Sequence, residues 1–312
     1  MRLLILTLLL SSCSYFQRDN KPVESNTSEA LSAKKALYCE QGKRVLAERG
    51  FMDDRCDSLL FSSLFEVSCP GSVDLSKWED TEQPGKWHRN PQRDCFINGQ
   101  PNGSASSISR DMFLGLWHAQ WSAKDSKNIS EIVAYGEANN WIMGEAKDNE
   151  TLLSRCLLTP QLITVLKEMD SKLGGQAGHP FRSENEDNSD DALPVNTGFR
   201  AHLDVLRILL NGRVYGAITD AEKSLLKSQA ERQPSNALYV AAYEKYNGGT
   251  KAHGLLLDKA HFPGDRLPTN AEHCQNYLFS RDQESDDWKP CAEAREHDGT
   301  DFVFAAWVAL NL

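Results

Sequence analysis

A short pattern, in which an aspartate is followed by an apolar run, recurs four times along the 312-residue chain. Its clearest copy is Ser109-Arg110-Asp111-Met112-Phe113-Leu114, which comes after a long polar stretch. A carboxylate is favoured in the first turn of a helix, because unpaired backbone N–H groups and the positive end of the helix dipole lie there. The pattern therefore predicts helix starts at Asp57, Asp111, Asp204 and Asp301.

The spacing of these starts constrains the fold more than any other feature of the chain. With two further helix-starting positions that lack the aspartate, Thr159 and His253, the gaps are 54, 48, 45, 49 and 48 residues. A repeat of this length is typical of architectures built from repeated helical units. Six helical hairpins that close on themselves form an (α/α)6 six-hairpin toroid, in which all six starts surround one end. The alternative is a generic helical bundle whose helix starts are evenly spaced.

Apolar periodicity predicts an all-α chain, since almost no stretch has the β-branched alternation of a strand. Thr159-Pro160 and Thr219 are strong helix-start signals, and Thr27 or Ser28 is expected to cap the first helix. Long connections are expected over residues 70–108, which are rich in Pro, Gly and Trp, and over the acidic stretch 175–195. The predicted helices cover residues 28–50, 54–67, 109–122, 126–139, 159–174, 199–211, 220–231, 235–246, 251–259 and 300–311.

The N-terminus has the pattern of an export signal. Met1-Arg2 is followed by an apolar run from Leu3 to Leu10, which is too short for a membrane span of about 20 residues. Leu10-Ser11-Ser12-Cys13 resembles the lipobox of bacterial lipoproteins, and that resemblance implies a lipidated Cys13 at the mature N-terminus. Ser14 is not the aspartate that retains such proteins at the inner membrane, so the outer membrane is expected. The alternative is an ordinary signal peptide with a chance cysteine.

This N-terminus divides the chain into three parts: a signal peptide over residues 1–12, a polar tether over 13–27, and one helical domain over 28–312. The chain is 40% hydrophobic, which is ample for a core. Its formal net charge is −10, and removal of Arg2 with the signal peptide changes it to −11. Nucleic acid is therefore not expected as a partner, because phosphate binding requires a basic face.

Seven cysteines remain after Cys13, and an oxidising compartment favours disulfides among them. The predicted pairs are Cys69–Cys95 and Cys274–Cys291, because each closes one loop. The odd count leaves at least one free thiol, most simply a buried one. No cysteine or histidine spacing suggests zinc, and neither a metal nor a cofactor is predicted.

The six evenly spaced helix starts resemble the six-hairpin toroids of glycoside hydrolases and polysaccharide lyases. The resemblance covers residues 28–312 and rests on spacing, not on a diagnostic motif. It implies a site for a glycan at the end where the helix starts meet. Ser109-Arg110-Asp111 with its apolar continuation also resembles a motif of uncharacterised bacterial lipoproteins, which carries no known activity.

The long loop supplies residue types suited to a sugar ligand, in the run from Trp87 through His88 and Arg89 to Arg93. An aromatic ring can stack on a sugar face, and guanidinium groups bind carboxylates and hydroxyls. Two carboxylates across a cleft can catalyse glycoside hydrolysis, whereas a histidine base with an arginine beside it suits a lyase. The candidate catalytic residues are Asp57, Asp111, His88 and Asp301, and the candidate substrate-binding residues are Trp87, Arg89, Arg93, Arg110, Asp204 and Trp288.

Two classes of function remain open at this point. One is an envelope enzyme that acts on a glycan, with Asp57 and Asp111 as the first pair of carboxylates and Asp204 and Asp301 as substitutes. The other is a non-catalytic lipoprotein that binds a glycan or another envelope protein. In the second case the tryptophans fill the end of the domain, and the arginines and backbone N–H groups engage the aspartates. Nucleotide chemistry and metalloproteolysis have no supporting motif.

Overall fold

The computed structural model describes residues 23–52, 57–92, 96–97, 100–101, 108–148, 151–175, 195–197, 199–259 and 299–311. These residues are mostly helical, which confirms the predicted all-α class. The helices are α1 (Val23–Arg49), α2 (Ser58–Ser68), α3 (Arg110–Ala123), α4 (Ser126–Ala138), α5 (Pro160–Lys172), α7 (Phe199–Tyr215), α8 (Asp220–Arg232), α9 (Ala237–Asn247), α10 (Lys251–Leu257) and α12 (Thr300–Asn311), with a short 3-10 helix at Leu75–Trp78. None of the described helices is both long and apolar enough to cross a membrane.

The helix-start signals at Thr159 and Thr219 act as local chemistry predicts. Thr159 accepts a hydrogen bond from the backbone N–H of Leu162 at the start of α5. Thr219 and Glu222 form a reciprocal capping box at the start of α8. The predicted cap at Thr27 or Ser28 is wrong, because α1 already begins at Val23.

The chain also forms a β-hairpin that the sequence did not predict. Strand β3 (Ile142–Asp148) pairs antiparallel with β4 (Thr151–Leu157), and a second, minimal pair joins β1 (Phe96–Ile97) to β2 (Gln100–Pro101). Strand β3 contains Gly144, Ala146 and Lys147, which have low strand propensity, and the β3–β4 register shifts twice. The hairpin therefore lacks the clean alternation by which strands are recognised.

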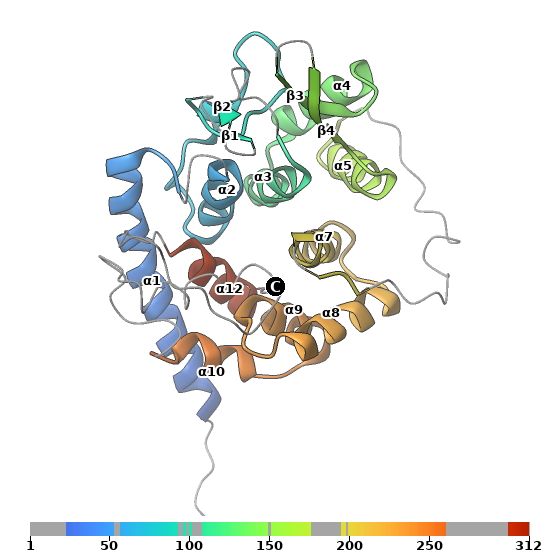
Figure 1. Cartoon of the computed structure of the whole chain (residues 1–312). Coiled ribbons are helices and arrows are strands. Elements are labelled where there is room, and N and C mark those ends of the chain that lie inside the picture. Colours follow the sequence, from blue (N-terminus) through green and yellow to red (C-terminus); the bar gives the residue numbers. More distant parts are fainter. Residues whose placement is uncertain are drawn as a thin grey trace, which may run out of the picture.

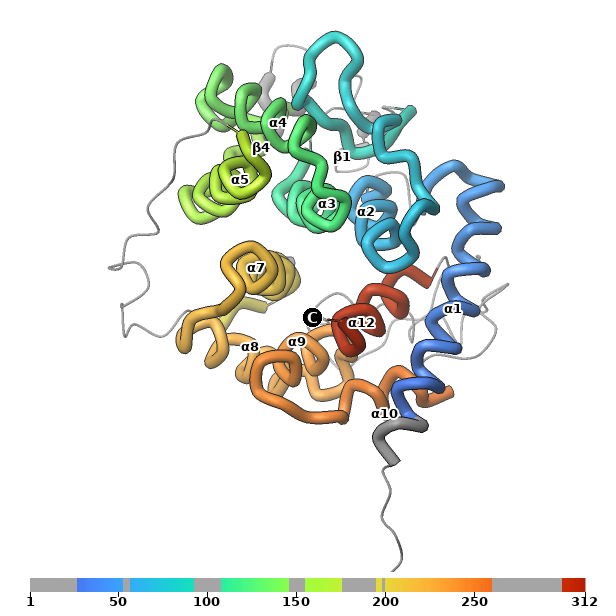
Figure 2. Tube along the Cα trace, turned by 180° about the vertical axis from the view of Figure 1, so that it is seen from behind, coloured from blue at the N-terminus to red at the C-terminus, as the bar shows by residue number. Residues whose placement is uncertain are grey.

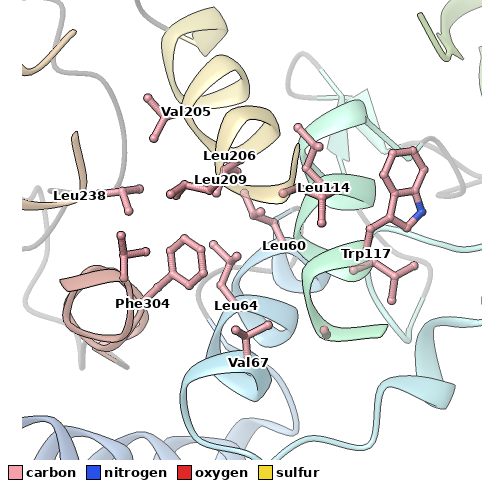
Figure 3. Close-up of a cluster of buried hydrophobic side chains, with 14 of the residues drawn as sticks. Leu60, Leu64, Val67, Leu114, Trp117, Val205, Leu206, Leu209, Leu238 and Phe304 are labelled. Atoms are coloured by element: carbon pink, nitrogen blue, oxygen red, sulfur yellow. The ribbon is translucent and has the colours of Figure 1, made fainter. Parts of the chain in front are cut away.

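Helices α2, α3, α7, α9 and α12 lie around the middle of the molecule, and α1, α4, α8 and α10 lie outside them (Figure 1). Helices α3 and α7 run parallel, because their contacts keep a nearly constant offset of 88–95 residues from one end to the other. The side chains that meet between the central helices are apolar and buried (Figure 3). They include Leu60 and Leu64 of α2, Leu114 of α3, Leu206 and Leu209 of α7, Leu238 of α9 and Phe304 of α12.

A disulfide links Cys39 in α1 to Cys69, which follows α2, with a Cα–Cα distance of 5.8 Å. The predicted Cys69–Cys95 bond is therefore wrong. Packing of the long helix α1 brings a cysteine 30 positions earlier in the chain to the end of α2, which loop length alone does not indicate. Cys95, Cys274 and Cys291 lie outside the described residues. Cys156 is a buried free thiol, as the odd number of cysteines predicted.

Candidate functional site

Polar side chains gather where α2, α3 and α7 begin. The central contact is between Asp111 in the first turn of α3 and His202 in the first turn of α7. Nε2 of His202 lies 3.4 Å from Oδ2 of Asp111, and both residues are buried, with 3% of the surface of His202 and 4% of that of Asp111 exposed. The hydroxyl of Ser109 donates to the other carboxylate oxygen of Asp111. The parallel arrangement of α3 and α7 brings these residues together, since both lie at the same end of their helices.

Asp57 and Arg89 form the second pair of the site. The carbonyl of Arg89 accepts hydrogen bonds from the backbone N–H of Leu59 and from the hydroxyl of Ser58, so the loop before α3 folds over the start of α2. Nη1 of Arg89 then lies 3.3 Å from Oδ1 of Asp57, and both side chains are partly exposed. Asp57 occupies the N-cap position of α2 but makes no side-chain capping hydrogen bond. Its carboxylate is therefore held by an arginine, as the non-catalytic alternative expected.

Cys156 near the end of β4 interacts electrostatically with residues of both pairs. Burial raises the pKa of its thiol to about 12, and the charges of Arg110, Asp111 and Arg89 act on it as well. Arg110, Asp111 and Arg89 therefore all lie close enough to the Cys156 sulfur to interact with it electrostatically. A thiol with this pKa is protonated at neutral pH, so Cys156 is not a nucleophile here.

Asp204 lies two positions after His202 in α7. Burial raises the pKa of its carboxyl group, while a hydrogen bond from Asn196 Nδ2 at 2.6 Å and the charges of Arg207, His202 and Arg200 oppose that rise. A half-buried carboxyl group with a raised pKa is suited to donate a proton. We call Asp57, Arg89, Arg110, Asp111, Cys156, His202 and Asp204 the helix-start cluster.

Trp87 and His88 are buried, although the partly exposed Arg89 follows them directly. His88 is 2% exposed, and its Nε2 lies 3.0 Å from Oδ2 of Asp80. Burial opposes ionisation of Asp80, but hydrogen bonds from Glu82, His88 and Gln83 and the charge of Lys86 hold its pKa at about 2. Trp87 is 1% exposed. Neither ring presents a face to a ligand in this structure, because both residues are buried.

The remaining predicted site residues are placed as follows. Arg110 begins α3 and is exposed. Asp301 is 5% exposed in the first turn of α12, where its Oδ1 accepts the backbone N–H of Phe302 at 2.8 Å. Helix α12 packs against α2, but we define the cluster without Asp301. Arg93, Trp288 and the lipidation candidate Cys13 lie outside the described residues.

Two members of the cluster, His202 and Cys156, were not predicted as site residues. His202 stands two positions before Asp204 in one of the four recurring helix starts, which was the available signal. Cys156 lies on the unpredicted strand β4, so no pattern marked it. In the part of the chain that the structure describes, no group of three or more His, Cys, Asp or Glu residues could hold a metal ion.

The helix-start cluster thus combines carboxylates, guanidinium groups and an imidazole from segments far apart in the sequence. Such a combination can bind polar ligands and transfer protons. Comparisons of the chain with known protein families, with curated proteins and with solved structures found no match.

Proposed function

We propose that this chain is a periplasm-facing lipoprotein of the outer membrane that binds and hydrolyses a glycan at the helix-start cluster. One observation carries the proposal: α2, α3 and α7 bring Asp57–Arg89, Asp111–His202 and Asp204 to the same end of the domain. The anchor is proposed from the lipobox-like Leu10-Ser11-Ser12-Cys13. The fold is proposed to be a six-hairpin toroid, which is supported by the parallel course of α3 and α7. The predicted helix start at His253 falls in α10, which lies outside the central helices.

The proposed chemistry assigns different roles to the carboxylates. Asp204 is the general acid, because burial raises its pKa. Asp57 or Asp111 is the nucleophile or base, with Arg89 in contact with Asp57 and His202 in contact with Asp111. Arg89 and Arg110 bind the hydroxyl or carboxylate groups of the sugar. A hydrolase is favoured over a lyase, because the histidine proposed as a lyase base, His88, is buried against Asp80.

The second candidate function is a non-catalytic lipoprotein that binds a glycan or a protein. The specific observation in its favour is that each carboxylate of the cluster already has a partner. Asp57 binds Arg89, Asp111 binds His202 and Ser109, and Asp204 accepts from Asn196. In this case the pairs of side chains hold the starts of the helices together, and the exposed Arg110 contacts the bound glycan or protein.

A glycan panel separates the two functions. Detergent-solubilised wild-type protein is incubated with neutral and acidic oligosaccharides and with cell-wall glycans, and new reducing ends are measured beside binding. For the enzyme we expect hydrolysis that Asp111→Asn and Asp204→Asn abolish, while thermal melts show that both variants remain folded at the assay temperature. The matched control is Asp220→Asn, which changes a carboxylate with 96% side-chain exposure at the start of α8. Binding without hydrolysis supports the second function, and neither binding nor hydrolysis contradicts both.

A further inference from the structure

Helix α1 contacts helices from both the beginning and the end of the helical domain's sequence. It precedes α2 in the sequence, yet it packs against α10 and α12, the last helices that the structure describes. Figure 2 shows α1 running along the outside of the molecule beside α12 and α10. Leu31, Tyr38 and Val45 of α1 recur every seven positions and have no exposed surface, so they lie on one buried face of the helix.

Lys34 of α1 contacts both α10 and α12, and Tyr38 of α1 contacts α12. Nζ of Lys34 donates to the carbonyl of Leu256 in α10 at 2.7 Å and lies 5.2 Å from the ring centre of Phe302. The ring of Tyr38 lies 4.1 Å from that of Phe302. Tyr38 also fits against Gly299, where a Cβ atom would lie 2.9 Å from Cδ1 of the tyrosine. Tyr38 therefore packs on the first turn of α12, which carries Asp301.

The next two contacts tie the same stretch of α1 to the end of α2. Lys35 Nζ donates to the carbonyl of Ser68, and Cys39 forms the disulfide with Cys69. Tyr38 and Cys39 are adjacent, so the covalent bond to α2 and the ring contact with α12 act on neighbouring residues of one rigid helix. Movement of α1 away from Cys69 also withdraws Tyr38 from Gly299 and Phe302.

We infer that the Cys39–Cys69 disulfide is a lock that holds α1 across α2 and α12 and thereby fixes the start of α12. The domain then reaches its complete arrangement only where this disulfide can form, which is after export to an oxidising compartment. In reduced protein, α1 and the first turn of α12 open locally, while the packing between α3 and α7 persists. This inference does not depend on the proposed glycan activity.

Hydrogen exchange, followed by mass spectrometry on the full chain, tests the lock. In the double variant Cys39→Ala/Cys69→Ala we expect the amides of residues 299–305 and of α1 to exchange about tenfold faster or more, because disulfides suppress local opening. Peptides from α4 and α5 should keep the wild-type rate. Cys156→Ala removes a buried sulfur that is not in a disulfide and serves as the matched control.

A second variant separates the lock from a general loss of stability. Tyr38→Ala keeps the disulfide but removes the contact with α12, so it should accelerate exchange at 299–305 in oxidised protein. The inference is overturned if residues 299–305 keep their wild-type exchange in the double variant. It is also overturned if all helices accelerate together, because the disulfide then stabilises the whole domain and not the α1–α12 contact.

Discussion

Nε2 of His202 lies 3.4 Å from Oδ2 of Asp111, although 91 positions separate the two residues in the sequence. We expect Asp111→Ala to lower the free energy of unfolding by about 1–3 kcal/mol, because it removes the carboxylate that contacts a buried imidazole and accepts from the Ser109 hydroxyl. Urea unfolding of the two single variants and of the double variant with His202→Ala measures the coupling. A coupling energy of about 0.5 kcal/mol or more is expected for residues in contact. Strictly additive effects would contradict the pairing.

A buried histidine at the opposite end of α3 should make stability depend on pH. Nε2 of His118 donates to the carbonyl of Leu206, and its Nδ1 accepts from Arg213 Nη1 at 2.9 Å, which is the neutral tautomer. Burial and the charge of Arg213 lower the pKa of His118 to about 3 from its ordinary 6.5. Between these two values the unfolded chain binds a proton that the folded protein does not. Stability should therefore fall as pH falls through this window, and His118 has no effect above it.

The contribution of His118 to this slope is at most about 1.4 kcal/mol per pH unit. Urea unfolding at several pH values, above and within the window, measures it. His118→Gln keeps an amide donor for Leu206 but cannot be protonated, so its stability should depend less on pH than that of the wild type. Equal slopes for the two proteins would show that the imidazole is not held neutral.

Two glycines inside helices should respond in opposite ways to the same substitution. A Cβ atom at Gly115 in α3 would lie 2.9 Å from Cδ1 and 3.0 Å from the carbonyl oxygen of Leu60, so the close approach of α2 and α3 depends on this glycine. We expect Gly115→Ala to destabilise the protein by about 1–3 kcal/mol. Gly254 in α10 has no atom within 4 Å of its Cβ position. Gly254→Ala should stabilise by up to about 1 kcal/mol. Melting temperatures of both variants test the pair, and equal shifts would refute the close approach.

The proposed lipid anchor depends on one sulfur atom. We expect Cys13→Ser to abolish incorporation of labelled palmitate and to move the protein from the membrane pellet to the soluble fraction, because the stable anchor consists of acyl chains. Density-gradient separation of wild-type membranes should place the protein with the outer membrane. Labelling that survives the substitution, or wild-type protein that stays soluble, would contradict the lipoprotein assignment.

Much of the helical structure is local and could be predicted from the sequence. The helix starts at Thr159 and Thr219 follow from side chains that accept backbone N–H bonds, and helix length follows from apolar periodicity. The hairpin of β3 and β4 could not be predicted, because residues such as Gly144 and Lys147 become a strand only when a partner strand supplies their hydrogen bonds.

The sequence by itself determined the all-α class, most helix boundaries and the presence of a buried free thiol, because these depend on neighbouring residues and on counting cysteines. Only the tertiary structure decided that Cys69 pairs with Cys39, that His202 meets Asp111, and that Trp87 and His88 lie in the core while Arg89 reaches Asp57. These contacts between distant residues depend on which helices pack side by side. Packing is decided by the fit of whole apolar faces, which no short stretch of sequence contains.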